Sequence, residues 1–236
     1  MEYQQLHRWD VTPQEAIGIQ RDLRRRLIAQ DDEQTAFRTV AAMDVSYDRQ
    51  SPWLFASIVL VRLPGLEIVE TASVRAQVRF PYIPGLLSFR ESPVGLQVWE
   101  KLRTHPDCLI CDGHGYAHPR RFGFACHFGL LVDLPTIGFA KTVLVGRFDP
   151  PGAARGSRSD LVDTGEVIGA VVRTRETASP VFVSVGHRIS LPRAVDTILA
   201  CMTGFRIPEP ARQAHILVNR LRESGAEPAG LGRLFG

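Results

Sequence analysis

Two aspartates stand where apolar segments end or are interrupted, and a carboxylate in such a position needs a partner. Asp44 lies within the mostly apolar run 39–46, and Asp112 follows the run 109–111 and opens a glycine-rich turn. Burying a carboxylate is costly unless it is paired or bound to a metal. With Glu91 as the best third candidate, they form the all-oxygen ligand set that Mg²⁺ prefers. Two such ions can activate a water and stabilise the leaving oxygen in phosphodiester hydrolysis.

Each of these aspartates also has a plain structural explanation, and the residues alone leave both explanations open. Asp44 can accept a hydrogen bond from a backbone amide, and Asp112 can begin an Asx-type turn. Lys141 follows Ala140 in a predicted strand that otherwise reads as buried, where its ammonium is a candidate for screening a scissile phosphate. Alternatively, it is a strand-end lysine whose head reaches solvent. Of the 28 basic residues, only Lys101 and Lys141 are lysines, which makes the second one conspicuous.

A histidine and a proline-rich turn are further candidates. His118 precedes Pro119 and two arginines, so it can contact a phosphate or a water, although a lone histidine is more often structural. The turn Pro81–Gly85 has two prolines, which stiffen it, and it carries Tyr82 and Ile83. A rigid apolar wedge of this type can enter a base stack. The alternative is an ordinary loop whose tyrosine packs on the core.

Composition limits the class of protein. The 236 residues are 44% hydrophobic and 22% charged, as in ordinary globular proteins, which excludes a disordered tail, a collagen and a coiled coil. A net charge of +3 does not by itself indicate a nucleic-acid binder, but it leaves room for a local basic groove. No apolar stretch approaches about 20 residues, and the polar start lacks a signal segment, so we expect a cytoplasmic protein with no membrane partner.

Cys108 and Cys111 form a C-x-x-C, but in a strand they point to opposite faces, so we expect free thiols rather than a metal site.

The elements that must position these residues can be read from the apolar spacing. A helix begins at Thr12-Pro13 with a capping box, and three strand-like segments with short turns follow, which predicts an antiparallel meander. After the meander, helices and strands alternate, which favours a mixed α/β sheet with helices on its faces. The predicted strands are 38–47, 53–63, 67–78, 108–112, 136–145, 166–174 and 181–185. The later predicted helices are 94–103, 124–132, 192–203 and 209–223, and 149–160 reads as a loop.

Six segments in this order resemble the endonuclease V family, the deoxyinosine-specific repair nucleases. They are Asp44–Tyr47, Pro81–Glu91, Asp112–Arg120, Pro135–Lys141, Gly186–Ser190 and Pro208–His215. The resemblance covers about residues 12–223. It implies a single domain over 1–236 with a ribonuclease H-like α/β fold: a central mixed sheet, its first three strands antiparallel, flanked by helices.

The resemblance also implies an activity and roles for named residues. The activity is Mg²⁺-dependent hydrolysis, with Mn²⁺ as a substitute, of the second phosphodiester bond 3′ to a deoxyinosine, leaving a 3′-hydroxyl and a 5′-phosphate. Asp44, Glu91 and Asp112 match the family's metal-binding carboxylates. His118, Lys141 and His215 match further catalytic residues, Pro81, Tyr82, Ile83 and Pro84 match the strand-separating wedge, and Leu87, Gly113 and Gly115 match the pocket for the flipped base. We expect a monomer that binds deoxyinosine-containing DNA.

Three other functions remain open at this stage. An inosine-directed ribonuclease would use the same fold and metal chemistry, because the chain shows no dependable reader of the 2′-hydroxyl. A catalytically silent lesion-binding module is disfavoured by the intact carboxylates. A resolvase-like nuclease is the weakest alternative, because a fold alone does not set the substrate.

Overall fold

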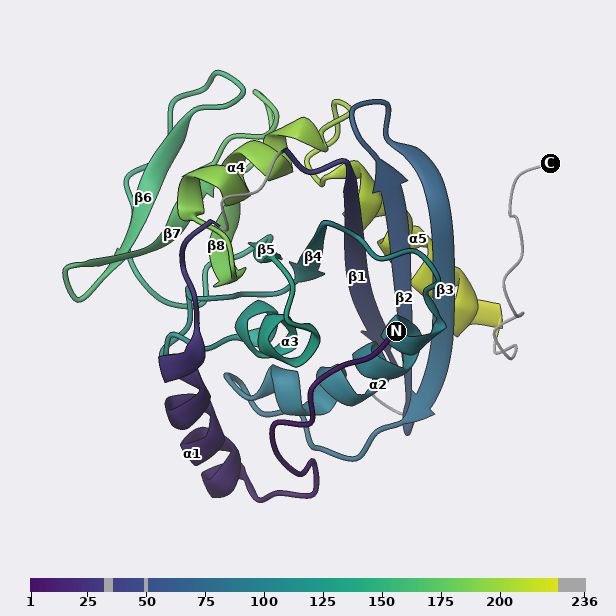
Figure 1. Cartoon of the computed structure of the whole chain (residues 1–236). Helices are drawn as coiled ribbons and strands as arrows, with labels where there is room; N and C mark the ends of the chain where they lie inside the picture. The colour runs from purple at the N-terminus through teal and green to yellow at the C-terminus, as the bar shows by residue number, and fades with distance from the viewer. Residues whose placement is uncertain (32–35, 49–50, 225–236) are drawn as a thin grey trace.

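The computed structural model describes residues 1–31, 36–48 and 51–224, so the part of the predicted domain that covers 225–236 lies outside the described residues. Within that range an eight-stranded sheet has the order β3-β2-β1-β4-β5-β8-β7-β6 and carries helices on both faces (Figure 1). The strands are β1 (Thr39–Tyr47), β2 (Trp53–Arg62), β3 (Glu67–Gln77), β4 (Cys108–Asp112), β5 (Thr136–Ala140), β6 (Arg158–Asp163), β7 (Glu166–Val172) and β8 (Val181–His187). The α-helices are α1 (Pro13–Leu23), α2 (Leu87–Lys101), α3 (Phe124–Val132), α4 (Leu191–Ala200) and α5 (Glu209–Ser224).

The sheet is mixed, as the sequence predicts. Strands β1, β2 and β3 form the antiparallel meander, whereas β1, β4 and β5 are parallel to one another. The crossovers between the parallel strands contain α2 and α3. Since parallel strands end at the same edge of a sheet, the carboxyl ends of β1, β4 and β5 lie together, and ligands bind at such edges in open α/β sheets.

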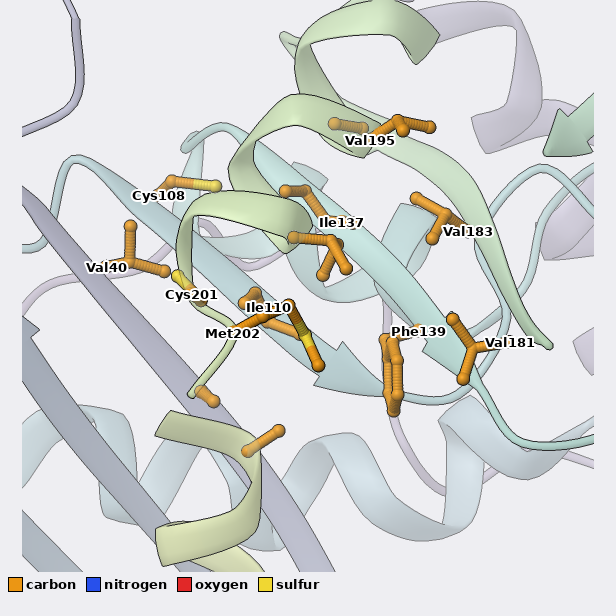
Figure 2. Close-up of a cluster of buried hydrophobic side chains, with 14 of the residues drawn as sticks. Val40, Cys108, Ile110, Ile137, Phe139, Val181, Val183, Val195, Cys201 and Met202 are labelled. Carbon is orange, nitrogen blue, oxygen red and sulfur yellow. The ribbon is translucent and has the colours of Figure 1, made fainter. Parts of the chain in front are cut away.

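Side chains of the central strands alternate between two hydrophobic cores. Val40, Cys108 and Ile110 belong to the core beneath α4 and α5, where Figure 2 shows them near Cys201 and Met202. Cys111 belongs to the other core, against α2 and α3. The two cysteines of the C-x-x-C therefore point to opposite faces, and all four cysteines of the chain are free and buried, as predicted.

The largest differences from the predicted elements concern α2, β5 and β6. Helix α2 begins at Leu87 rather than at 94, and it continues through Pro93, which lies inside the helix. Strand β5 ends at Ala140 rather than at 145, so Lys141 lies just beyond the strand. The segment Arg158–Asp163, predicted as a loop to residue 160, is the edge strand β6; its charged residues suit an edge that faces solvent.

The capping box predicted at the start of α1 is present. The Thr12 side chain accepts from the Glu15 amide, and the Glu15 carboxylate accepts from the Thr12 amide. No helix among the described residues is long and apolar enough to cross a membrane.

Candidate active site

Strand register brings Asp44 and Asp112 together. Met43 pairs with Cys111 across β1 and β4, and each aspartate is the next residue on its strand. Among the described residues, Asp44, Asp112 and His215 each offer a ligand atom, and these atoms all lie within 4.8 Å of one another. Two neighbouring carboxylates at the carboxyl ends of central strands can hold a divalent cation.

His215 of α5 orients the Asp44 carboxylate. Its Nδ1 lies 2.7 Å from Asp44 Oδ2, and its Nε2 lies 3.1 Å from the Asn219 side-chain nitrogen. Because the Asn219 amide donates to Nε2, Nδ1 carries the proton and donates to Asp44. Asn219 is fixed in turn, since its Oδ1 accepts from the Ser46 hydroxyl of β1 at 2.9 Å. The chain Ser46–Asn219–His215–Asp44 therefore ties helix α5 to the acidic edge of the sheet.

Glu91 lies on α2, one turn after the start of that helix, and is 5% exposed. Burial raises its pKa well above the ordinary range, and the negative charges of Asp44 and Asp112 raise it further. Burial and the Asp112 charge likewise raise the pKa of Asp44, although His215 and Lys141 oppose that shift. The nearby positive charges thus compensate the acidic cluster incompletely. A divalent cation would supply the missing charge, so the residues present fit a metal of the Mg²⁺ or Mn²⁺ type.

Lys141 lies beside the same carboxylates. Its Nζ is 2.7 Å from Asp112 Oδ2, and the side chain is about one-third exposed. The backbone is held as well, because Arg206 Nη2 donates to the Lys141 carbonyl at 2.8 Å. Lys101, the other lysine, lies exposed at the end of α2 and reaches only the Ser73 carbonyl, at 3.4 Å. The two lysines therefore have different surroundings, and only Lys141 reaches the acidic site.

A cavity of about 330 Å³ opens next to this cluster, within the usual size range of ligand sites. Leu87 and Gly113, two of the three residues predicted for the base pocket, line it together with Asp112 and Lys141. Gly115, the third, does not line it. Gly115 is packed against β8, where a Cβ would lie 2.1 Å from the Val185 carbonyl oxygen.

The proline-rich turn forms another wall of the cavity. Tyr82 is 59% exposed, and Ile83 and Pro84 line the cavity beside it. The end of the turn is fixed through the Gly85 carbonyl, which accepts from three side chains: His118 Nε2 at 3.0 Å, Arg120 Nη2 at 2.6 Å and Gln20 Nε2 at 3.0 Å. Gly85 has φ +79°, and a Cβ there would lie 2.8 Å from Arg120 Nη2, so the site requires glycine.

His118 is 3% exposed, and both of its ring nitrogens are engaged. Nε2 donates to the Gly85 carbonyl, and Nδ1 accepts from the Arg120 amide at 3.2 Å. Burial, with Arg120 adding to it, lowers the pKa of His118 to about 4. The ring is therefore neutral near pH 7, and its direct effect is to hold the tyrosine-bearing turn.

Gln20 and Arg120 are site residues that the sequence reasoning missed. Arg120 Nε donates to Gln20 Oε1 at 2.6 Å, and Gln20 also reaches the Phe122 carbonyl at 3.1 Å. The sequence holds a signal for Gln20, because this polar residue stands four residues after Ala16 and three before Leu23, on the apolar face of the helix, where the structure leaves it 1% exposed. Its partners come from distant segments, so the sequence alone did not identify the contact.

An acidic pair, a lysine and a cavity at the carboxyl ends of central strands are the arrangement expected of a metal-dependent, phosphodiester-cleaving nuclease. The family model for endonuclease V matches residues 21–216. Endonuclease V of Gloeobacter violaceus is 48% identical over 98% of this chain and 94% of its own length. The chain belongs to the endonuclease V family.

Solved structures agree with this assignment. Endonuclease V of Streptomyces avermitilis is 41% identical, with a TM-score of 0.87 over 92% of this chain and 96% of its own. Endonuclease V of Ciona intestinalis, solved with a DNA that contains an inosine followed by a ribo-adenosine, is 25% identical, with a TM-score of 0.82 over 90% of this chain and 98% of its own. The predicted family and the predicted ribonuclease H-like α/β fold are confirmed.

Proposed function

We propose that this protein is a monomeric DNA repair endonuclease that recognises deoxyinosine and hydrolyses the second phosphodiester bond 3′ to it, leaving a 3′-hydroxyl and a 5′-phosphate. The observation that carries the proposal is the cavity whose walls include Leu87 and Gly113 and whose edge includes Asp112 and Lys141. One opening thus serves both a flipped base and a scissile phosphate. The DNA-bound relative from Ciona intestinalis supports the choice of lesion.

Asp44, Glu91 and Asp112 are the proposed ligands of the metal, for which Mg²⁺ is our choice and Mn²⁺ the substitute. When bound, the metal would activate a water and stabilise the leaving oxygen. Carboxylate oxygens favour these hard cations, whereas imidazole nitrogens favour softer ones. His215 is already engaged on both ring nitrogens, so its proposed role is to orient Asp44 rather than to replace a carboxylate.

The other predicted site residues bind and orient the substrate. Lys141 carries a compact ammonium next to Asp112 and counters the charge that builds up on the phosphate. The wedge, Pro81 to Pro84 with Tyr82 at its exposed tip, fills the gap that the lesion leaves in the stack. Flipping inosine costs less than flipping a properly paired base, since its pairing is weaker. The proposed role of His118 is to keep the wedge in place through Gly85.

A second candidate is an inosine-directed ribonuclease. The specific observation in its favour is that the DNA bound to the Ciona intestinalis enzyme has a ribo-adenosine directly after the inosine. The same carboxylates and the same cavity would serve either sugar.

The test is a substrate panel with one labelled strand. Duplex DNA with a single deoxyinosine, the matched unmodified duplex and an inosine-containing RNA of the same sequence are each incubated with Mg²⁺ or with EDTA. We expect Mg²⁺-dependent nicking of the deoxyinosine strand at the second 3′ bond. A clear preference for the RNA would favour the second candidate, and no nicking of either strand would reject both.

Two aspartate variants complete the test. Asp112→Ala should abolish cleavage and keep much of the binding, because the cavity and the wedge remain. Asp196→Asn is the matched control, since Asp196 lies exposed on α4 and lines no part of the cavity. If Asp112→Ala still cut at the normal rate, the assignment of the acidic site would be wrong.

A further inference from the structure

Two exposed apolar side chains have no role in the function proposed above. Large hydrophobic residues are mostly buried in this chain, but Tyr82, Val143 and Leu144 are 59%, 43% and 43% exposed, and all three line the same cavity. Tyr82 is the tip of the proposed wedge. Val143 and Leu144 come from a different segment, the connection that follows β5, and they lie two and three residues after Lys141.

The backbone around Val143 and Leu144 is fixed on both sides. Before them, Arg206 Nη2 donates to the Lys141 carbonyl at 2.8 Å. After them, Arg147 and Val162 exchange two backbone hydrogen bonds, at 2.7 and 2.9 Å. Two apolar side chains thus stand in solvent on a rigid support. Such a surface is preorganised for an apolar ligand face, and binding to it costs little ordering entropy.

The position of the pair indicates what covers it. Under the proposed function, on which this inference rests, the lesion base enters the cavity and the second phosphodiester bond lies at the acidic edge, so one nucleotide connects them. Val143 and Leu144 lie two and three residues after the lysine at that edge and line the same cavity. Their side chains can neither pair with a phosphate nor form hydrogen bonds. They suit the apolar face of a base, which any of the four bases offers.

We propose that Val143 and Leu144 pack against the base of the nucleotide directly 3′ of the lesion and thereby position the second phosphodiester bond over the acidic site. The contact lies within the damaged strand and depends on the face of the base rather than on its edge. It is therefore independent of base identity, and it acts on single-stranded and duplex substrates alike. It explains how an enzyme that holds one base can cut one nucleotide further along.

The experiment is a double-mutant cycle between protein and substrate. Wild type and the double variant Val143→Ser/Leu144→Ser are compared on two deoxyinosine strands, one with a normal 3′ neighbour and one with an abasic residue there. We expect the variant to raise KM about tenfold on the normal strand, in the range of one lost base contact. The abasic neighbour should raise the wild-type KM by a similar factor, and the two changes together should raise it no further.

Controls separate this contact from a loss of folding or of function. Val167→Ser and Ile28→Ser remove exposed apolar side chains that do not line the cavity, and they should leave KM unchanged. If the serine variant has a lower Tm than wild type, the milder variant Val143→Ala/Leu144→Ala replaces it in the same KM comparison. If wild type does not cut the normal strand, the proposed function itself fails. This inference is wrong if wild type cuts but the increases in KM from the double variant and from the abasic neighbour multiply when combined. It is also wrong if the double variant raises KM for duplex substrates only.

Discussion

Glu91→Gln should stabilise the metal-free protein at pH 7 while removing its activity. The Glu91 carboxyl is 5% exposed, and burial together with two neighbouring aspartates raises its pKa. The pKa of this carboxyl is higher in the folded state than its ordinary value of 4.5 in the unfolded state. The free energy of unfolding is therefore highest below pH 4.5, and it falls as the pH rises from 4.5 toward the folded-state pKa. Glutamine has nearly the same shape and carries no charge, so it removes that cost.

The size of the effect follows from the pH interval. Between pH 4.5 and pH 7, each pH unit lowers the free energy of unfolding by at most about 1.4 kcal/mol, so the full span sets an upper bound of about 3.5 kcal/mol. The buried glutamine amide costs about 1–2 kcal/mol of this where it is poorly paired. A net gain of up to about 2 kcal/mol remains. For a chain of this length, it corresponds to a rise in Tm of about 4 °C.

The assay is thermal melting in EDTA at pH 7 and at pH 4, repeated with Mg²⁺ at pH 7. Glu100→Gln is the matched control, because Glu100 lies exposed on the same helix, and it should change the Tm little. The gain from Glu91→Gln should vanish at pH 4, because the carboxyl is then mostly protonated in both states and the cost of the buried amide remains. Mg²⁺ should raise the Tm of the wild type more than that of the variant. A variant that is less stable than wild type in EDTA at pH 7, or equally stabilised at both pH values, would refute the reasoning.

Three further predictions concern single side chains. Lys141→Arg should lower kcat strongly, because a planar guanidinium does not fit where a compact ammonium lies 2.7 Å from Asp112. Lys101→Arg is the control and should leave kcat unchanged. Near-normal turnover of Lys141→Arg would show that the reaction does not require a lysine at this position. Tyr82→Ser should raise KM for duplex substrate more than for single strands, and an equal effect on both would contradict a strand-separating role. Side-chain NMR should find His118 neutral at pH 6 with the proton on Nε2, since its pKa is about 4; a protonated ring at that pH would exclude its fixed donation to the wedge turn.

The sequence predicts seven of the eight strands that the described residues form, and the acidic edge of the sheet, but not the edge strand β6. Alternating apolar residues located β1 and β4 correctly, and polar residues at the ends of those segments identified Asp44 and Asp112 as neighbours. This worked because burial of alternate residues is a local signal, with a period of two along a strand. The role of His215 follows only from the family resemblance, whereas the two prolines that flank Tyr82 and Ile83 are a local signal for a rigid apolar wedge.

What the sequence could not supply depends on long-range contacts or on conflicting local signals. Pro93 is a breaker by local preference, yet packing of α2 against the sheet keeps the helix intact around it, so the start of the helix was placed too late. Val143 and Leu144 continue the apolar run after Ala140 and were assigned to β5, whereas the structure leaves them in solvent. The three donors to the Gly85 carbonyl lie far from it along the chain, and no local pattern predicts their convergence.

The pairing of Met43 with Cys111 has a consequence for how this protein can vary. The distance between Asp44 and Asp112 is set by whole residues of two central strands, so it changes only in steps. Inserting one residue into β1 before Asp44 would turn its carboxylate from one core to the other, and a later compensating loop could not restore it. Substrate range can therefore drift through the wedge and the connection after β5, while the lengths of β1 and β4 stay fixed. The position of the acidic edge is thus fixed by strand register, whereas the walls of the cavity include loops whose lengths can change.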